Sequence, residues 1–590
     1  MSTDSLVKGN TQHSRDAKTD SKTVGTTLDN VRINQLSPTA TEWLRKVLQT
    51  LDSKDIDGYV QFMAEDVEVI FNNGDVTMRG RTDVRKGLAQ FWQSFGTLEH
   101  DELNIYGTDQ NFVHEALNRY TTLDGRAVTI RAVAWIDRND RGGTVISFDD
   151  ATQDVRILHN TSILVSGTQI ASIFPRSQNV TLPQDTEIVP SEGKIISPFV
   201  DTHRHLWQTA FRTIASNTSL AEYFSRYGEF TQVGTVYNAD DVYYGQLTGI
   251  YESLNAGVTS ILDHAHHTWS NDTALAGLNA SVASGARVWW CYAIHNLTNG
   301  YSRAEQLAYF QDLLEDGPSR NSSTVEVGLA YDMLSLDPPS AVETVLDVAS
   351  YGILNTSIPL VFSHGSFLSV EDVQLLRSTN QYLSITPESE MHYGHTHPIS
   401  HLAQDQAALG VDTHFTFSAD IVTQARLWLQ VVRRLLYQQV LENWRIPRNN
   451  PMSVNQAFLL ATRAGGLALR RPDIGVLREG AKADIVVFDG SSPNMLGWVD
   501  PVAAVVLHSN VGDVQHVMVD GQFKKRDFEL TVGDDYEEVQ QRFLESARRI
   551  QAIWEATPLP DLQGEFQSGS GIYYADAMTV DVVRGNGTGY

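Results

Sequence analysis

Short apolar runs alternate with longer amphipathic segments through the middle of this chain. Apolar runs of this length predict buried strands, at 195–203, 258–266, 286–294, 325–333, 359–366, 382–389 and 411–417. Segments with helical spacing follow them, at 239–256, 272–284, 302–316, 339–351, 370–380, 402–409 and 421–440. Strands that alternate with helices indicate an α/β fold with a parallel sheet, and at this length a (β/α) TIM-like barrel.

The pattern changes on both sides of this barrel, which we place at 196–474. Short strands separated by turn residues occupy 139–195 and 475–530, and their similar texture predicts one composite β-sandwich built from both segments. Residues 531–590 predict one helix, Asp535–Glu555, and a Gly/Ser-rich tail. Residues 1–38 are polar and mostly lack apolar periodicity, which predicts a disordered tail.

Residues 39–138 predict a separate α+β unit in which helices and two short strands precede three long strands, at 98–107, 111–121 and 127–137. This order resembles the SnoaL-like branch of the NTF2-like fold, a cone made by a curved sheet and helices. We expect a binding or oligomerisation module, since fold does not imply function. The alternative is a working cyclase, isomerase or dehydratase. Its pocket residues would be Tyr59, Trp92, His100, Asp101 and His114.

Composition narrows the partners and the compartment. A net charge of −27 disfavours nucleic acid and anionic membranes as partners. The single cysteine, Cys291, excludes an intramolecular disulfide and a zinc site made of cysteines. No apolar run reaches the ~18 residues of a membrane span, and the N-terminal residues lack a hydrophobic segment. We therefore expect a cytoplasmic protein whose partner is a small-molecule substrate, with a homo-oligomer left open.

The first barrel strand ends in a pair of histidines, His203 and His205. Because side chains alternate along a strand, both imidazoles lie on one face, where two such groups can bind one divalent metal. Two further H-x-H triplets occur, at 264–266 and 395–397, where chance predicts about 0.5 in a chain of this composition. The spacing alone therefore does not select the metal site.

An ordered series of motifs does select it: PFVDTHRHLWQ, GVTSILDHAHH, FSHGSFLSVEDVQLL, SITPESEMHYGHTHP, LGVDTHF and GAKADIVVFD. Over about 142–530 the chain resembles the metal-dependent amidohydrolase superfamily, in its triazine hydrolase, chlorohydrolase and cytosine-deaminase-like group. The resemblance implies four metal ligands, His203, His205, His364 and Asp412. It also implies that Asp412 and His364 are catalytic.

The chemistry of this donor set agrees with the resemblance. Three neutral imidazoles and a carboxylate can hold one Zn²⁺ or Fe²⁺ and leave a position open for water. The metal lowers the pKa of that water, and a carboxylate beside it can accept the proton. We expect a metal-dependent hydrolase, with zinc before iron. Its substrate would be a carbon–nitrogen bond, outside peptides, in a cyclic or heteroaromatic small molecule.

The chain departs from the family pattern between Asp332 and Val361, which are separated by 28 residues. One βαβ unit takes about 30 residues, so we count seven barrel strands and one βα unit missing. The fifth strand would carry a histidine, and the deaminases of the group place a glutamate soon after it. An error in the coding sequence, a real loss, or substitution by another histidine would each explain the gap. The candidate substitutes are His264, His266, His392 and His414.

The remaining candidates are substrate-binding residues near the barrel mouth: His264, His266, Glu388, His392 and His414. Glu388 and His392 are expected on the loop after the seventh strand. Two other functions stay open. The barrel would then be a catalytically inactive, amidohydrolase-like binding or scaffold protein, or the activity would reside in the SnoaL-like domain.

Overall fold

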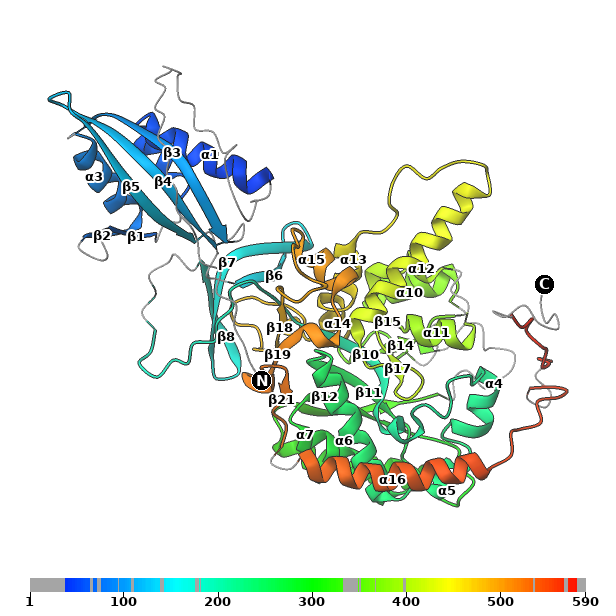
Figure 1. The fold of residues 1–590 in the computed structure, drawn as a ribbon. Helices are drawn as coiled ribbons and strands as arrows, with labels where there is room; N and C mark the ends of the chain where they lie inside the picture. The colour runs from blue at the N-terminus through cyan, green and yellow to red at the C-terminus, as the bar shows by residue number, and fades with distance from the viewer. Residues whose placement is uncertain are drawn as a thin grey trace, which may run out of the picture. The chain divides into compact units, whose positions relative to one another are not determined.

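The chain forms two compact units, 1–139 and 140–590. Figure 1 shows the fold of the computed structural model. The structure describes residues 38–63, 67–71, 76–93, 95–107, 111–137, 143–175, 180, 182–332, 348–349, 352–366, 368–395, 399–533, 536–566 and 571–580. The predicted tail at 1–38 lies outside the described residues except for Pro38.

The first unit has the predicted order of elements. Its helices and strands are α1 (Pro38–Asp52), α2 (Ile56–Val60), β1 (Glu68–Phe71), β2 (Val76–Arg79), α3 (Gly80–Trp92), β3 (Phe95–Gly107), β4 (Asn111–Thr122) and β5 (Ala127–Asp137). The three long strands form an antiparallel sheet in the order β3-β4-β5, and β1 pairs with β2. Helix α3 buries Val84, Leu88 and Trp92 against Val60 of α2.

The pocket candidates of this unit have different environments. Trp92 belongs to the hydrophobic core, and His114 is buried. The His100 ring lies 2.6 Å from a carboxylate oxygen of Asp52. Burial raises the pKa of Tyr59 to about 12. The side chain of Asp101 lies outside the described part of the chain.

The second unit contains the parallel strands of a barrel wall. Five of them pair in the order β13-β12-β11-β10-β17 and three in the order β14-β15-β16. Their bounds are β10 (Val200–His205), β11 (Ser260–Ala265), β12 (Arg287–Ala293), β13 (Val325–Ala330), β14 (Val361–Ser363), β15 (Tyr382–Ile385), β16 (Ala407–Leu409) and β17 (Asp412–Thr413). All these pairs are parallel, as the βα pattern predicts.

One short connection joins the two sheets into one curved wall. Strand β16 pairs with β15, and β17, which begins at Asp412, pairs with β10. The backbone between them is held on both sides, because Gly410 donates to the carbonyl of Ile385 and Val411 donates to that of His203. A Cβ on Gly410 would lie 2.8 Å from the backbone nitrogen and the Cβ of His203. Only glycine lets the wall close this tightly.

The wall is open between β13 and β14, which are the end strands of their sheets among the described residues. The 28 residues between Asp332 and Val361 connect them, and 333–347 lie outside the described residues. The predicted helix 339–351 falls mostly in this segment, with only 348–349 described. The part of the wall that the structure describes therefore supplies seven barrel positions, counting β16 and β17 as one.

Helices follow the strands along the chain, and several of them begin at a residue that can cap a helix. The main ones are α6 (Ala239–Asn255), α7 (Asn271–Ser284), α8 (Arg303–Asp316), α10 (Val370–Thr379) and α12 (Ile421–Leu441). Capping boxes begin four of them, at Asn238, Ser270, Ser302 and Ser369. Each cap satisfies backbone N–H groups that have no partner inside the helix. Shorter helices are α4 (Leu220–Glu222), α5 (Val233–Val236), α11 (Pro387–Tyr393), α13 (Val454–Leu460), α14 (Arg463–Ala468) and α15 (Pro501–Ala503).

Both predicted β patches contribute to one eight-stranded sheet, in the order β21-β20-β19-β18-β9-β6-β7-β8. Its strands are β6 (Gly143–Asp149), β7 (Asp154–Ser166), β8 (Gln169–Pro175), β9 (Lys194–Ser197), β18 (Ile485–Asp489), β19 (Val514–Val519), β20 (Gln522–Arg526) and β21 (Glu529–Leu530). The sheet curls back on itself, since Ile170 of β8 exchanges backbone hydrogen bonds with Gly480 and Ala481. Strand β9 lies between β18 and β6 and leads after two residues into β10.

Two predicted elements near the barrel mouth are wrong. The segment 402–409 is not a helix: 3₁₀ turns at Ser400–Leu402 and Gln404–Gln406 precede strand β16, whose pairing with β15 overrides the helical propensity of its alanines. The strand predicted at 382–389 ends at Ile385. Pro387 then begins helix α11, so Glu388 and His392 lie on a helix rather than a loop.

The C-terminal helix α16 (Tyr536–Ala556) packs along the barrel, as its apolar stripe predicts (Figure 1). Trp554 is fully buried, packs on Phe211 at 4.8 Å between ring centroids, and donates to the carbonyl of Arg226. The Arg226 guanidinium in turn donates to the carbonyls of Thr557 and Pro558. None of the described helices is long and apolar enough to cross a membrane.

We expect Trp554→Ala to lower the free energy of unfolding by about 3–5 kcal/mol, because it leaves a large cavity. Leu544→Ala is the matched control on the same helix, where the side chain is exposed and the expected change is within about 0.5 kcal/mol. Urea unfolding, followed by far-ultraviolet circular dichroism of the backbone, measures the free energy of unfolding of both variants. Equal effects of the two substitutions would show that α16 is not held by this contact.

Candidate metal centre

Strand β10 carries His203 and His205 into the barrel at its carboxyl end. Asp201, two residues earlier, holds this strand end in place, since its carboxylate accepts from the backbone N–H groups of His203 and Val411. The Arg204 side chain also donates to Asp201 and leaves the opposite face to the two imidazoles. Both histidines are buried, as the alternation of the strand requires.

His364 reaches the same point from the three-stranded sheet, and Asp412 reaches it from β17, which pairs with β10. His364 directly follows β14, and Asp412 begins β17. Their backbones have positive φ angles, 70° and 76°. Such conformations are uncommon outside glycine and cost of order 1–3 kcal/mol each. They direct the two side chains toward β10, which fits the general observation that backbone strain concentrates at functional sites.

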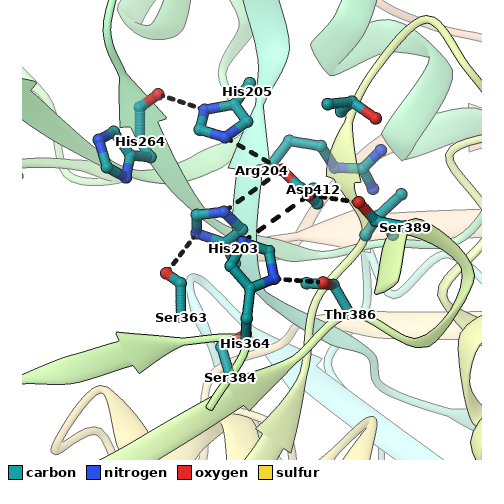
Figure 2. Close-up of polar contacts among 12 residues, drawn as sticks. His203, Arg204, His205, His264, Ser363, His364, Ser384, Thr386, Ser389 and Asp412 are labelled. Atoms are coloured by element: carbon teal, nitrogen blue, oxygen red, sulfur yellow. Dashed lines mark hydrogen bonds and ion pairs between the residues drawn. The ribbon is translucent and has the colours of Figure 1, made fainter. Parts of the chain in front are cut away.

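The imidazoles of His203, His205 and His364 converge on the carboxylate of Asp412 (Figure 2). Its Oδ1 lies 3.0 Å from Nε2 of His205 and 3.4 Å from Nε2 of His203. Its Oδ2 lies 3.9 Å from Nε2 of His364. One ligand atom each of His203, His205 and Asp412 lies within 4.8 Å of the other two. The structure therefore brings together all four residues predicted to bind metal.

The opposite nitrogen of each imidazole is held by a separate partner. Nδ1 of His205 donates to the carbonyl of His264 at 2.9 Å. Nδ1 of His203 lies 2.9 Å from the Ser363 hydroxyl, and that of His364 lies 2.9 Å from the Thr386 hydroxyl. Metal-binding histidines are oriented in this way, with one nitrogen anchored and the other turned to the ion.

Two further side chains complete this environment. The Ser389 hydroxyl donates to Oδ2 of Asp412 at 2.5 Å. Glu390 lies 3.4 Å from Nδ1 of His364 and accepts from the Thr386 backbone. Ser363, Thr386 and Ser389 lie within two of the sequence motifs but were given no role there, because hydroxyls at strand ends are common and only their neighbours in space give them one.

His264 of β11 and His266, which directly follows that strand, flank this cluster without facing Asp412. The His264 ring is turned to Asp332, with Nε2 2.9 Å from the carboxylate. The His266 ring stacks on His205 at 4.0 Å between centroids and accepts from the indole N–H of Trp207. Both lie in the barrel mouth beside the predicted ligands.

Three other predicted residues face elsewhere. His392 donates to the carbonyl of Thr218, and the Glu388 carboxylate accepts from Gln424. His414 is fully buried between Arg204 and Glu252, although it follows Asp412 by two residues. The structure thus separates these three from the four side chains that converge.

The donor set fits a divalent metal. Nε2 of His203 is buried and has no hydrogen-bond partner among the described residues, at the point where an ion would be bound. Burial lowers the pKa of His203 to about 3, so its imidazole is neutral at pH 7, the form that binds metal. Burial alone would raise the pKa of Asp412. Contact with His203 and His205 outweighs burial and lowers that pKa well below its usual range.

Two parts of the chain match known protein families. Residues 340–524 match the Amidohydrolase family, and residues 44–146 match the SnoaL-like domain. The chain therefore contains a region that matches the Amidohydrolase family, and a SnoaL-like domain precedes it in the sequence. Both resemblances read from the sequence are confirmed.

Relatives of known activity match over most of their length. A 5-methylthioadenosine/S-adenosylhomocysteine deaminase of Pyrococcus abyssi is 24% identical over 442 residues, which are 69% of this chain and 97% of that protein. A 5'-deoxyadenosine deaminase of Methanobrevibacter smithii is 22% identical over 410 residues, 64% of this chain and 91% of that protein. These relatives are hydrolases of carbon–nitrogen bonds outside peptides.

Solved structures share the fold. An adenosine deaminase from Xanthomonas campestris with bound zinc aligns with a TM-score of 0.56 at 17% identity, covering 70% of this chain and 98% of that one. Atrazine chlorohydrolase from Arthrobacter aurescens TC1 in complex with zinc aligns with a TM-score of 0.55 at 17% identity, covering 69% and 99%. The predicted TIM-like barrel is thus confirmed, and the fold is one that holds a divalent metal in these proteins.

We expect His203→Ala to lose one equivalent of divalent metal per chain, or to bind it at least about 100-fold more weakly, because it removes a direct ligand. His392→Ala is the control, since its ring faces Thr218 and not Asp412. Metal analysis after equilibrium dialysis against zinc measures both variants. Unchanged metal content in His203→Ala would remove this cluster as the metal centre.

The buried network behind Arg204 predicts a pH dependence of stability. Burial alone would raise the pKa of Glu252, but His414 and Arg212 outweigh it and lower that pKa from 4.5 to about 2. The deprotonated carboxylate therefore favours the folded state. This contribution to stability is complete above about pH 4.5 and is lost as the pH falls toward 2. The difference between the pKa values of Glu252 in the unfolded and folded states corresponds to about 3 kcal/mol of unfolding free energy.

We expect the unfolding free energy of the wild type to fall by about 3 kcal/mol more than that of Glu252→Gln between pH 4.5 and 2. Urea titrations at a series of pH values provide the comparison. Parallel pH curves for the two proteins would contradict the role given to this carboxylate.

Proposed function

We propose that this chain hydrolyses a carbon–nitrogen bond on a heteroaromatic ring, with one divalent metal held by His203, His205, His364 and Asp412. Water adds to an sp² ring carbon, the bond to the leaving amine breaks, and the products are the hydroxylated ring, in its keto form, and ammonia. Zinc is the proposed ion, because imidazole and carboxylate groups are ligands that suit it.

One observation supports this proposal most directly. Three imidazole Nε2 atoms and one carboxylate converge at the carboxyl ends of barrel strands, and each imidazole is anchored at its other nitrogen. If these histidines served only to stabilise the fold, nothing would require that their three Nε2 atoms face the same carboxylate. The carboxyl ends of the strands are also where barrel enzymes place their active sites.

Asp412 is the proposed proton acceptor and donor. When bound, a divalent metal lowers the pKa of a water molecule it coordinates toward neutrality. Asp412, whose carboxylate stays ionised, takes up the proton of that water and delivers it to the leaving amine. Ser389 keeps the carboxylate oriented by its hydrogen bond to Oδ2. His364 lies beside the same oxygen, with its Nε2 3.9 Å from Oδ2.

The substrate class follows from the relatives and from the departure from their pattern. The deaminases that match this chain act on adenosine derivatives, which points to 6-aminopurine nucleosides as the first substrates to test. The shortened stretch between Asp332 and Val361 is where the family places a fifth-strand histidine and, in deaminases, a glutamate. Because the shortened stretch is where deaminases carry that glutamate, we extend the proposal to halide leaving groups, which need less protonation than an amine. Cytoplasmic location and self-association stay predictions.

The test is release of ammonia or chloride from a panel of purine nucleosides, guanine and chlorinated or aminated triazines. We expect turnover that a chelator abolishes and zinc restores. Asp412→Asn should reduce kcat by about 10²–10⁴-fold, because it removes the proton-transferring group. His392→Gln is the control variant and should retain activity within a few-fold.

A folded, zinc-loaded protein that turns over none of these substrates above the level of Asp412→Asn would contradict the proposal. Ligand binding that persists in that case would favour the binding or scaffold function. Turnover that survives Asp412→Asn but disappears on mutation of His100 would instead locate the activity in the SnoaL-like domain.

A further inference from the structure

A second group of polar side chains lies at the ends of the neighbouring strands. His295 follows β12, and Asp332 follows β13. Glu229 comes from the segment before α5. One ligand atom from each of these three residues lies within 4.8 Å of the other two. The sequence motifs marked none of them, because they lie 37 to 103 positions apart along the chain.

The backbones of two of these residues are fixed by buried side chains. The amide of Gln306 on α8 donates to the carbonyl of His295 and accepts from its N–H. The indole of Trp269 donates to the carbonyl of Glu229. Because these main-chain groups are already satisfied, the side chains of His295 and Glu229 are directed inward by a rigid frame.

The imidazole of His295 is the informative member of this group. It is fully buried, and neither ring nitrogen has a hydrogen-bond partner among the described residues. An unsatisfied buried polar group costs about 1–3 kcal/mol and calls for a ligand. Phe230, whose ring meets the imidazole edge at 5.3 Å between centroids, supplies only apolar contact.

The charges point to a cation. Carboxylate oxygens of Glu229 and Asp332 lie within 4.8 Å of each other, and two negative charges at this separation repel each other. The His295 side chain is fully buried, and burial favours the neutral imidazole. A neutral imidazole between two carboxylates is a donor set for a divalent transition metal, and the ion would offset the repulsion between the acids.

We propose that Glu229, His295 and Asp332 form a second divalent-cation site beside the first metal centre. Three ligands spaced evenly around one ion, each about 2.0–2.2 Å from it, lie at most about 3.8 Å apart, so atoms within 4.8 Å of one another would need to close by up to about 1 Å. Manganese or zinc fits two oxygens and one imidazole nitrogen.

His264 connects this site to the first centre. Its Nε2 contacts Asp332, and its carbonyl accepts from Nδ1 of His205. A cation bound by Asp332 would therefore fix the orientation of His264 and, through it, of a ligand to the first metal. The second ion is not a participant in the proton transfer assigned to Asp412.

The experiment is a metal titration of the apo protein with Mn²⁺, followed by electron paramagnetic resonance, and with Zn²⁺, followed by elemental analysis. We expect two ions per chain in the wild type. Glu229→Gln and the near-isosteric His295→Phe should each lose one ion, with at least about 100-fold weaker binding at that step. His516→Phe changes a buried histidine in the eight-stranded sheet and should keep both ions.

His203→Ala separates the two centres, because it should also lose one ion while keeping the one that Glu229→Gln removes. The double variant His203→Ala/Glu229→Gln should bind none. A single ion in the wild type that is lost in His203→Ala would overturn the second site and leave the hydrolase proposal standing. Two ions retained in both Glu229→Gln and His295→Phe, with the fold intact by circular dichroism, would overturn it as well.

Discussion

The buried carboxylate of Asp412 is the constraint on which the candidate site depends. A carboxylate removed from water is stable only when other groups compensate its charge. Here three imidazole nitrogens face it, and the Ser389 hydroxyl donates to it. A divalent cation among these groups would satisfy them all. The wall must close at this point to bring them together, and the glycine at 410 allows β16 and β17 to lie directly against His203.

The eight-stranded sheet gives this arrangement its support. Strand β9 lies in the middle of that sheet and continues after two residues into β10, so the strand that carries both histidines starts from a fixed position. At the same end of the barrel, Arg287 of β12 forms buried ion pairs with Asp484 and Asp520. Removing one partner of such a buried pair costs about 3–5 kcal/mol, because it leaves an uncompensated charge. Strand β10, which carries two of the metal-binding side chains, is thus fixed at its amino-terminal end by the eight-stranded sheet, and β12 is fixed at its own by these buried ion pairs.

Much of this was predictable from the sequence, for physical reasons. Strand alternation places His203 and His205 on one face, and the resemblance carried by the ordered motifs predicts His364 and Asp412 as their partners. Local pattern failed where tertiary pairing decides the conformation, as at 407–409, whose alanines form a strand. It also failed for partners in space, since nothing near His414 in the sequence shows that its ring turns to Glu252. The group of Glu229, His295 and Asp332 was missed for the same reason.

We infer that one ion is bound by four side chains from the two described sheets of the barrel wall. Anomalous diffraction from crystals of the zinc-loaded protein, recorded on both sides of the zinc absorption edge, tests it directly. We expect a strong peak about 2.0–2.2 Å from Nε2 of His203, His205 and His364 and from a carboxylate oxygen of Asp412. Zinc bound elsewhere with these four side chains turned apart, or no peak in a correctly folded crystal, would contradict it.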